Sequence, residues 1–349
     1  MENKEAAQYI ENINIKGLWG RYDVDWQLHA DVNILVGENG TGKSTILKGI
    51  MELLWLSDED LKDSSVFKNY KPVFDSLEIT DVYISDVRLD VKQKHVYKLE
   101  NNPEVHITVN YINPKTQSVT KKFDKKPFAK TFFSGFAEEI ARKNSYKSPY
   151  TEKLNINYIV TFDSPFYSKT DKELNRKPYI KSTLDDELDV LIDKYVEYQL
   201  NQNKKLRFNG NTYESVFANQ KYFIETINRL FINTEKKIDE EENRLSFLTI
   251  DNRKITPFEL SSGEKQLLII FLTVLCQDKL PTILLLDEPE ISLHITWQYE
   301  LINIIRQLNP NCQVIIATHS TSIFTKGWMN KLFFMDGVEG IRHKIAQHV

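Results

Sequence analysis

The chain lacks the residues that would identify several classes of protein. Only two of its 349 residues are cysteine, Cys276 and Cys312, and both lie inside apolar segments without forming a C-x-x-C pair. This argues against a zinc hook, a redox motif and a disulfide framework. We expect both cysteines to be small buried side chains.

Long hydrophobic runs and an excess of one charge are also missing. The opening segment, MENKEAAQYIENINIKG, has no apolar core of the kind found in signal peptides, and no run approaches the length of a membrane span. Lys and Arg total 45 against 49 Asp and Glu, so the net charge of -4 provides no whole-protein attraction to nucleic acid or membrane. We therefore expect a cytoplasmic protein without a membrane partner.

The remaining composition and patterning predict an α/β protein. The hydrophobic content of 41% can form one large domain or two smaller ones, and there is no internal repeat, low-complexity tract or linker. Strands and a helix surround the glycine-rich loop near residue 40, and alternating residues from Leu77 to Phe123 predict an antiparallel meander. After a strand that ends at Asp163, the pattern is helical to about Leu245 and then returns to strands and helices.

The glycine-rich loop GENGTGKST, residues 37–45, fits the pattern G-x-x-x-x-G-K-[ST] between a strand and a helix. In such a loop the backbone N–H groups wrap phosphates, Lys43 reaches the outer phosphates, and the Ser44 hydroxyl binds Mg²⁺. A chance glycine loop is the alternative, and further motifs must decide. The predicted nucleotide-binding residues are Asn39, Gly40, Thr41, Gly42, Lys43, Ser44 and Thr45.

Two later strands end in polar residues that suit the same site. ILLLDEPE ends in Asp287, which can hold Mg²⁺ through water, and Glu288, which can orient or deprotonate an attacking water. VIIATHS places His319 where it can approach a γ-phosphate. An acidic turn and a structural histidine are the simpler readings of each motif alone.

A third stretch, FELSSGEKQLLIIFLTVL, places Ser261, Ser262 and Gly263 ahead of an apolar helix. The first N–H groups of a helix have no partner within it and favour an anion.

Taken in order, GENGTGKST, LSSGEKQ, LLLDEPE, SLH and IIATHS resemble the ABC-type ATPase head of the soluble branch that includes the RecF, SMC and OLD families. PEISLH and ATHS resemble the OLD-like ATPases of bacterial anti-phage systems. GLWGRYDVDW and TFDSP are similar to stand-alone ATPase subunits such as that of PARIS systems. The resemblance implies a P-loop NTPase fold with an antiparallel β subdomain and a short helical arm. Its expected parts are a first ATPase lobe, the helical arm and a second ATPase lobe, at residues 1–163, 164–245 and 246–349.

The resemblance also implies a mechanism. ATP and Mg²⁺ are the expected cofactors, with Ser44 and Asp287 on the metal and Glu288 and His319 in catalysis of ATP hydrolysis. The signature residues Ser261, Ser262, Gly263 and Glu264 are expected to meet the γ-phosphate bound by a second copy. ATP would thus join two heads in a homodimer or a higher homo-oligomer.

The sequence departs from the family pattern where a glutamine usually ends the strand that enters the helical lobe. Asp163 is the best substitute there, and an ordinary turn aspartate is the alternative. Contacts to the adenine base are assigned to the region of Trp19, Arg21 and Tyr22, whose aromatics are core residues in the simpler reading.

Local charge and the remaining length bear on partners. Residues 115–153 hold ten Lys or Arg against four acids with interleaved phenylalanines, which suits nucleic acid, an acidic partner or simply a solvated face. The thirty residues after His319 are too few for a Toprim nuclease domain. We expect an anti-phage ATPase that controls a separately encoded effector, such as a Toprim-type or other nuclease. A RecF-like ATPase that clamps duplex DNA and a transporter subunit are the alternatives.

Overall fold

Two long apolar runs form the centre of a five-stranded sheet. Every residue of β14 (Thr282–Asp287) and β15 (Cys312–Thr318) is buried. Continuous apolar runs are typical of parallel strands that are covered on both faces. In the computed structural model, β15 pairs in parallel with β14 and with β3 (Val32–Val36), and the strand order is β16-β3-β15-β14-β8.

An antiparallel sheet of seven strands forms the β subdomain, in the order β17-β2-β1-β4-β5-β6-β7. The alternating segment predicted between Leu77 and Phe123 forms four of these strands, each pairing antiparallel with the next, which confirms the meander. The strands of both sheets not yet given bounds are β1 (Gln8–Leu18), β2 (Tyr22–Gln27), β4 (Ser76–Ile84), β5 (Val87–Tyr97), β6 (Pro103–Ile112), β7 (Val119–Lys125), β8 (Ile156–Val160), β16 (Leu332–Phe334) and β17 (Ile341–His343).

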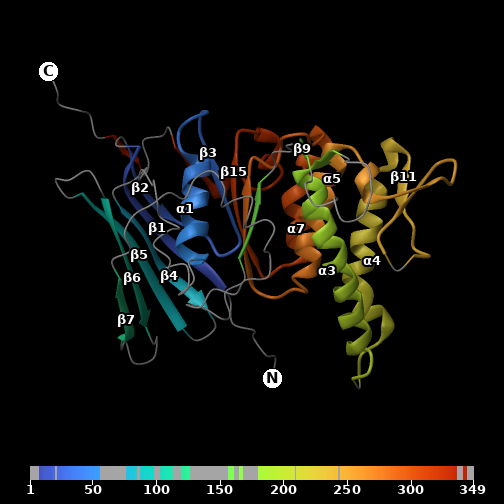
Figure 1. Cartoon of the computed structure of the whole chain (residues 1–349), viewed down its shortest axis with the longest axis horizontal. Coiled ribbons are helices and arrows are strands. Elements are labelled where there is room, and N and C mark those ends of the chain that lie inside the picture. Colours follow the sequence, from blue (N-terminus) through green and yellow to red (C-terminus); the bar gives the residue numbers. More distant parts are fainter. Residues whose placement is uncertain are drawn as a thin grey trace. The chain divides into compact units, whose positions relative to one another are not determined.

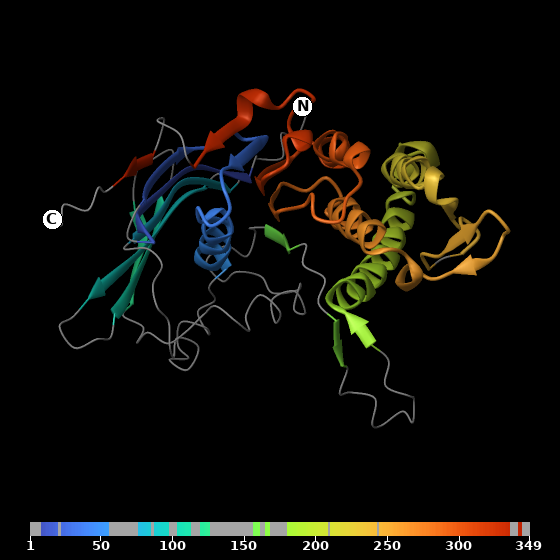
Figure 2. The ribbon, with the colours of Figure 1, turned by 90° about the horizontal axis from the view of Figure 1, so that it is seen from above.

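Helix α1 (Lys43–Trp55) lies between the two sheets (Figures 1 and 2), because it contacts β14 and β15 as well as β5. The two sheets also meet through a buried glutamine. Gln313 on β15 donates from Nε2 to the backbone oxygens of Ile10 and His29 at 2.8 Å each, and its Oε1 accepts from Ile10 N at 2.9 Å. A polar group in this core is therefore fully satisfied.

The chain divides into two compact units. Unit 1 comprises residues 1–159, 281–289 and 311–349, and unit 2 comprises residues 160–280 and 290–310. The predicted boundaries fall after residues 163 and 245, whereas this division falls after residue 159 and assigns residues 246–280 to unit 2. The structure describes residues 8–19, 22–55, 76–84, 87–97, 103–112, 119–125, 156–160, 165–167, 180–208, 210–242, 244–335 and 341–343.

Unit 2 is built on the apolar helix that was expected after Gly263. Residues 263–275 of α5 (Ser262–Cys276) are all buried, and α5 packs against α3, α4 and α7. The other elements of unit 2 are α3 (Thr183–Lys205), α4 (Tyr213–Leu230), α6 (Ile295–Gln298), α7 (Leu301–Leu308) and the short strands β9 (Pro165–Tyr167), β10 (Ile180–Ser182), β11 (Lys236–Ile238), β12 (Phe247–Thr249) and β13 (Lys254–Ile255).

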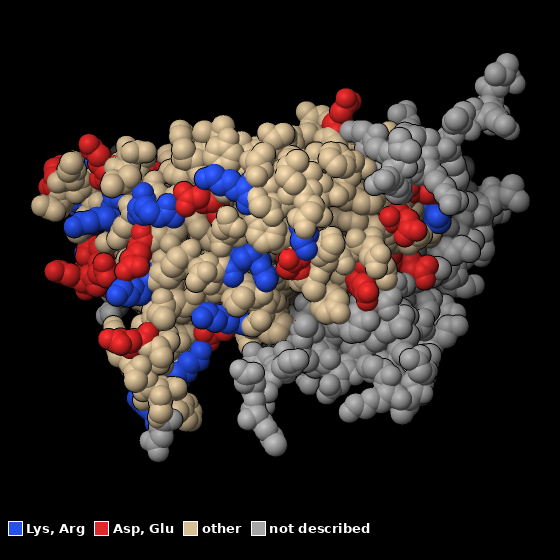
Figure 3. Space-filling view, turned by 180° about the vertical axis from the view of Figure 1, so that it is seen from behind, with Lys and Arg blue, Asp and Glu red and all other residues tan. Residues whose placement is uncertain are grey.

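Helix α3 follows the predicted amphipathic pattern. Ser182 caps it and forms a capping box with Asp185, and the predicted stripe Leu188, Leu191, Ile192, Tyr195 and Tyr198 is buried. Over unit 2, basic and acidic side chains are interspersed on the face shown in Figure 3. Among the described residues, no helix is long and apolar enough to cross a membrane.

Candidate functional site

The carboxyl ends of three parallel strands bring the polar motifs of unit 1 to one edge of the sheet. Asp287 on β14 pairs with Ala317 on β15, and Thr318 pairs with Val36 on β3. The glycine-rich loop, Glu288 and His319 each follow one of these strand ends. Ligands of parallel α/β sheets bind at this edge.

The glycine-rich loop adopts the backbone that its sequence requires. Gly40 and Gly42 have φ angles of +81° and +98°, a backbone conformation that residues other than glycine rarely adopt. Helix α1 begins at Lys43, so its first N–H groups face the loop. Of the predicted phosphate-binding residues, Asn39 and Gly40 are exposed, Thr41 and Lys43 are buried, and Gly42, Ser44 and Thr45 lie between these extremes.

Lys43 folds back onto its own loop. Its Nζ donates to the backbone oxygens of Gly37 at 3.0 Å and Glu38 at 2.9 Å. The same Nζ lies 2.8 Å from His319 Nε2. Because an ammonium group carries only donors, this ring nitrogen accepts, and the proton of a neutral His319 is on Nδ1.

Ser44 and Asp287 form the predicted metal pair. The Ser44 hydroxyl donates to Asp287 Oδ1 at 2.8 Å, and the hydroxyl of Tyr158 on β8 donates to Oδ2 at 3.1 Å. Burial raises the pKa of Asp287 above its ordinary value, although these two hydrogen bonds and Lys48 act in the opposite direction. No group of three or more His, Cys, Asp or Glu among the described residues could hold a metal alone. A hydroxyl beside one carboxylate instead fits Mg²⁺ that takes its other ligands from phosphates and water.

Glu288 turns out of its strand in an unusual conformation. Its φ angle is +50°, in the left-handed region, and its N–H donates to the Ala317 oxygen at 2.8 Å. Its Oε1 lies 3.4 Å from His319 Nε2, and both side chains are partly exposed. Lys43 and Glu288 therefore meet the same nitrogen of His319. Strained non-glycine residues of this kind concentrate at functional sites.

The remaining predicted residues of the nucleotide site have different outcomes. Asp163 and Arg21 lie outside the described residues, so their assignments stay predictions. Trp19 lies beside the glycine-rich loop, because a Cβ on Gly42 would come within 3.0 Å of its Nε1. Half of the Trp19 surface is exposed, which leaves it accessible to a base. Tyr158 was not predicted, and its position in an ordinary apolar strand gave no signal.

The signature loop, residues 261–264, belongs to unit 2. Ser261 and Ser262 are exposed, whereas Gly263 and Glu264 are buried. A Cβ on Gly263 would lie 2.2 Å from the backbone oxygen of Ser292, so only glycine fits there without a shift of backbone. This contact joins the start of α5 to the segment EISLH that follows Glu288 and Pro289 in the sequence.

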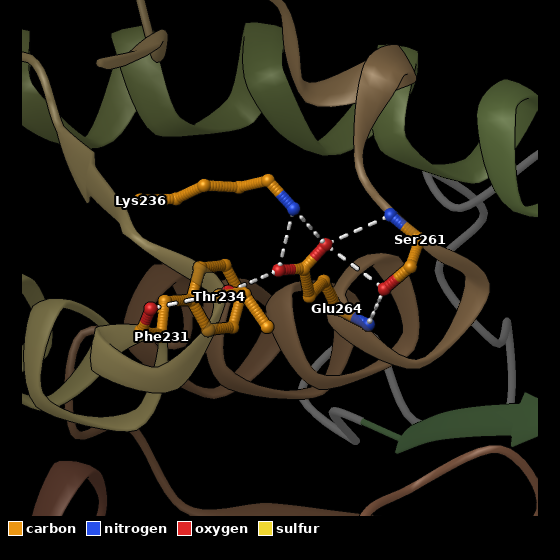
Figure 4. Close-up of polar contacts among 5 residues, drawn as sticks. All are labelled: Phe231, Thr234, Lys236, Ser261 and Glu264. Atoms are coloured by element: carbon orange, nitrogen blue, oxygen red, sulfur yellow. Dashed lines mark hydrogen bonds and ion pairs between the residues drawn. The ribbon is translucent and has the colours of Figure 1, made fainter. Parts of the chain in front are cut away.

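Glu264 points into the unit rather than outward. Its side chain is fully buried and accepts hydrogen bonds from Thr234, Lys236 and Ser261 (Figure 4). Burial alone would raise its pKa, but these hydrogen bonds outweigh it and hold the pKa below its ordinary value. The carboxylate thus holds the loop from within, and a direct contact of this side chain with a second copy would require it to leave this site. Thr234 and Lys236 carry no motif, so sequence reasoning did not find them.

Comparisons with known proteins place this chain among ATPases. Residues 32–325 match the family model described as "AAA domain, putative AbiEii toxin, Type IV TA system". The chain is 23% identical to "Retron Vc95 probable ATPase" of Vibrio cholerae serotype O1 biovar El Tor, over 84% of this chain and 67% of the relative. It is 30% identical to "Probable metal transport system ATP-binding protein" of Chlamydia muridarum (strain MoPn / Nigg), over 30% of this chain and 42% of that protein.

Among solved structures, the chain is similar to the SMC head domain from Thermotoga maritima, with 14% identity, 91% of each chain covered and a TM-score of 0.39. The range that matches the family model, residues 32–325, contains the glycine-rich loop, the signature loop, Asp287 and His319. The parallel sheet and its loop make the fold an α/β P-loop NTPase, and the chain belongs to the AAA ATPase-domain family described as "AAA domain, putative AbiEii toxin, Type IV TA system".

Proposed function

We propose that this chain is an Mg²⁺-dependent ATPase whose two copies associate around two ATP molecules and control a separately encoded effector. The observation that carries the ATPase part is the hydrogen bond between Ser44 and Asp287, at 2.8 Å, beside Lys43, Glu288 and His319. These five residues come from three separate motifs and supply the groups that P-loop hydrolysis requires.

Each residue then has a distinct part. Lys43 exchanges the backbone oxygens of Gly37 and Glu38 for nucleotide phosphates, since the carbonyls carry only partial charge. Glu288 orients the attacking water and accepts its proton. His319, whose Nε2 accepts from Lys43 and lies 3.4 Å from Glu288 Oε1, is placed to contact the γ-phosphate between Lys43 and Glu288. Bound Mg²⁺ would be held by Ser44 and Asp287 and would supply positive charge at the phosphates.

The association of two copies is supported by the exposure of Ser261 and Ser262 at a helix start. Donors at such a position favour the charge of a γ-phosphate. Hydrolysis would remove that contact and loosen the pair, because each conformation binds ATP and ADP with different affinity.

Light scattering tests the association. The Glu288→Gln variant should bind ATP without turnover and double its mass when ATP and Mg²⁺ are added. Adding Ser262→Arg should keep this variant at the mass of one copy while ATP still binds. A Glu288→Gln protein that stays at one mass with ATP would contradict the paired arrangement, and one that hydrolyses ATP normally would contradict the role of Glu288.

The effector part rests on names and on the resemblance. One relative is named as the ATPase of a retron, and the family description names a toxin of a Type IV TA system. Both fit an ATPase that acts within a larger anti-phage system. Purification of the tagged chain together with the product of its neighbouring gene, followed by mass measurement with and without ATP, tests this part. Absence of a stable or ATP-dependent complex would contradict it.

A further inference from the structure

The carboxylate of Glu264 is the centre of a buried polar cluster, in which Thr234 and Lys236 belong to no sequence motif. Lys236 Nζ lies 2.9 Å from each of its oxygens, and the Thr234 hydroxyl donates to Oε1 at 2.6 Å. The Ser261 N–H and hydroxyl donate to Oε2 at 2.8 and 2.9 Å. Figure 4 shows these side chains converging from β11, the turn before it and the start of α5.

Lys236 supplies the opposing charge in this cluster. The Glu264 side chain is 0% exposed and that of Lys236 is 20% exposed. A buried carboxylate is costly unless it is both paired and hydrogen-bonded. Removal of the ammonium would therefore leave an uncompensated negative charge directly behind the signature loop.

The cluster also determines what Ser261 can do. Its hydroxyl donates to Glu264 Oε2 and accepts from the Glu264 N–H at 3.4 Å, which completes a capping box. The Ser261 hydroxyl is thus used within its own unit. Ser262 is exposed, and its hydroxyl is therefore the one that the loop can offer to a second copy.

A second contact fixes the other side of the loop. The backbone of Gly263 lies so close to the Ser292 carbonyl that a Cβ added to the glycine would be 2.2 Å from its oxygen, and Ser292 has a φ angle of +69°. The loop is therefore held from two sides, by β11 through Lys236 and by the segment around Ser292.

We propose that Lys236 is a positioning residue for the signature loop, acting through Glu264 and Ser261 so that Ser262 presents its donors to the nucleotide of a second copy. This inference rests on the proposed association of two copies. Ser261 is then a helix cap, and Ser262 is the residue that meets phosphate.

Three variants of the full chain test this. Lys236→Met removes the ammonium but keeps an unbranched side chain, and Lys236→Arg restores the charge with a fork that fits a carboxylate. Lys265→Met is the matched control. Lys265 pairs with Asp185 at 2.7 Å with side chains 11% and 14% exposed, so it removes a similarly buried ion pair from the same unit without touching the Glu264 carboxylate.

Amide hydrogen exchange without nucleotide reads the loop directly. We expect Lys236→Met to raise the rate of exchange at residues 261–264 by about tenfold or more, because the loop loses the ammonium that compensates the Glu264 carboxylate. A tenfold change corresponds to about 1.4 kcal/mol in the free energy of opening the loop. Lys236→Arg should stay within about threefold of the parent protein, as should Lys265→Met at these four residues. Equal exchange in Lys236→Met and the parent protein would overturn the positioning role.

Activity provides the second measurement. Lys236→Met should lose turnover by about tenfold or more and lose ATP-dependent association, while its affinity for a fluorescent ATP analogue stays within about twofold of the parent protein. Lys265→Met should lose thermal stability to a similar extent and keep its turnover per folded molecule. A parallel loss of turnover in both variants would reduce Lys236 to a general stability role and overturn the proposal.

The outcomes separate this inference from the function on which it rests. If the parent protein does not associate with ATP, the paired mechanism fails, while hydrogen exchange still decides whether Lys236 holds the loop. If Lys236→Met does not fold, Lys236→Met with Glu264→Gln removes the unpaired charge. That double variant should fold and still exchange faster at residues 261–264, because neutral hydrogen bonds are weaker than charge-assisted ones. Exchange equal to that of the parent protein would overturn the proposal.

Discussion

Ser44 and Asp287 lie 243 positions apart in the chain, yet their side chains are within hydrogen-bond distance. At the scale of single residues, the site depends on such pairs, in which each partner limits the orientation of the other. His319 illustrates the same point, because one ring nitrogen meets both Lys43 and Glu288. A change at one residue should therefore alter its partners, and single variants can separate binding from chemistry.

Lys43→Ala should abolish nucleotide binding. The ammonium is already at the loop, where it donates to the backbone oxygens of Gly37 and Glu38, and the Thr41 hydroxyl that also donates to Glu38 carries no charge to replace it. We expect a loss of affinity of at least about 100-fold, or about 2.7 kcal/mol, in a titration with a fluorescent ATP analogue. Lys331→Ala is the control, since Lys331 pairs with Asp31 at the opposite end of β3. Equal affinities for the two variants would remove Lys43 from the site.

Tyr158→Phe should weaken the response to Mg²⁺ without preventing turnover. It removes only the hydroxyl that donates to Asp287 Oδ2, and groups that orient a metal ligand typically change metal affinity about 10- to 100-fold. The Mg²⁺ concentration for half-maximal turnover should rise by about tenfold, while kcat at saturating Mg²⁺ stays within about threefold. An unchanged Mg²⁺ requirement would show that Asp287 is oriented without Tyr158.

Glu264 should contribute to the pH dependence of stability. Its folded pKa lies below the ordinary value of 4.5, so the folded protein gains stability from the ionised form. This contribution is complete above about pH 4.5 and is lost as the pH falls through the folded pKa. In urea denaturation, the parent protein should therefore lose its advantage over Glu264→Gln as the pH falls.

Glu187, which lies on α3, should affect the pH dependence of stability in the opposite direction. Burial raises the pKa of its carboxyl to about 7, so ionisation costs stability as the pH rises from about 4.5 toward 7. The free energy of unfolding of Glu187→Gln should therefore increase relative to that of the parent protein as the pH rises.

The role of the Glu264 carboxylate in stability would be wrong if Glu264→Gln lost stability on acidification as steeply as the parent protein does.

At the scale of elements, α5 links the fold to the signature loop. Its residues 263–275 are buried. The helix starts at two exposed serines, and the glycine that follows them, Gly263, packs closely against the backbone carbonyl of Ser292. A buried helix cannot tilt or slide without disturbing its neighbours, because protein interiors are closely packed. The direction of the loop is therefore determined by the packing of the whole helix.

Gly263→Ala tests this dependence. A Cβ would lie 2.2 Å from the Ser292 oxygen, and a backbone carbonyl cannot rotate away as a side chain can. We expect a decrease of about 1–3 kcal/mol in the free energy of unfolding, typical of overpacking, together with a loss of turnover. Urea denaturation and phosphate release measure these. Ser262→Ala, one residue earlier and exposed, should keep the stability within about 0.5 kcal/mol. Parent-like stability of Gly263→Ala would mean that the segment around Ser292 is free to move.

At the scale of the whole molecule, the nucleotide site and the signature loop belong to different units. Each unit has its own core, so ATP bound to unit 1 need not order unit 2 of the same copy. The paired arrangement predicts that unit 2 responds to ATP only when a second copy is present.

Hydrogen exchange with ATP on the Glu288→Gln background measures that response. Residues 37–45 and His319 should be protected by ATP in any copy that binds it, because they lie at the carboxyl ends of β3 and β15, where the phosphate site is. Residues 261–264 should be protected by ATP as well, but only where two copies associate. Adding Ser262→Arg should therefore remove the protection of residues 261–264 and leave the protection at the phosphate site unchanged. Protection of the signature loop in a protein that stays at the mass of one copy would contradict the paired arrangement.

The sequence by itself determined the parts of this protein whose chemistry is local. The glycine-rich loop, the apolar strands that end in Asp287 and Thr318, and the capped amphipathic helix α3 each depend on residues close together in the chain. Their patterns therefore predicted both the element and the residues at its end. The α/β fold and the meeting of Lys43, Ser44, Asp287, Glu288 and His319 followed, because the ends of neighbouring parallel strands share one edge of a sheet.

Only the tertiary structure decided which side chains hold these motifs in place. Tyr158 donates to Asp287 from the neighbouring strand β8, and Lys236, which pairs with Glu264, lies 28 positions earlier in the chain. Neither has a sequence pattern, because an apolar strand accepts a tyrosine and a short strand accepts a lysine at many positions. The role of Ser261 changed for the same reason. Its position ahead of an apolar helix predicted a ligand. The direction of its hydroxyl instead depends on where the buried Glu264 carboxylate lies, and that is determined by packing and by the need to pair a buried charge.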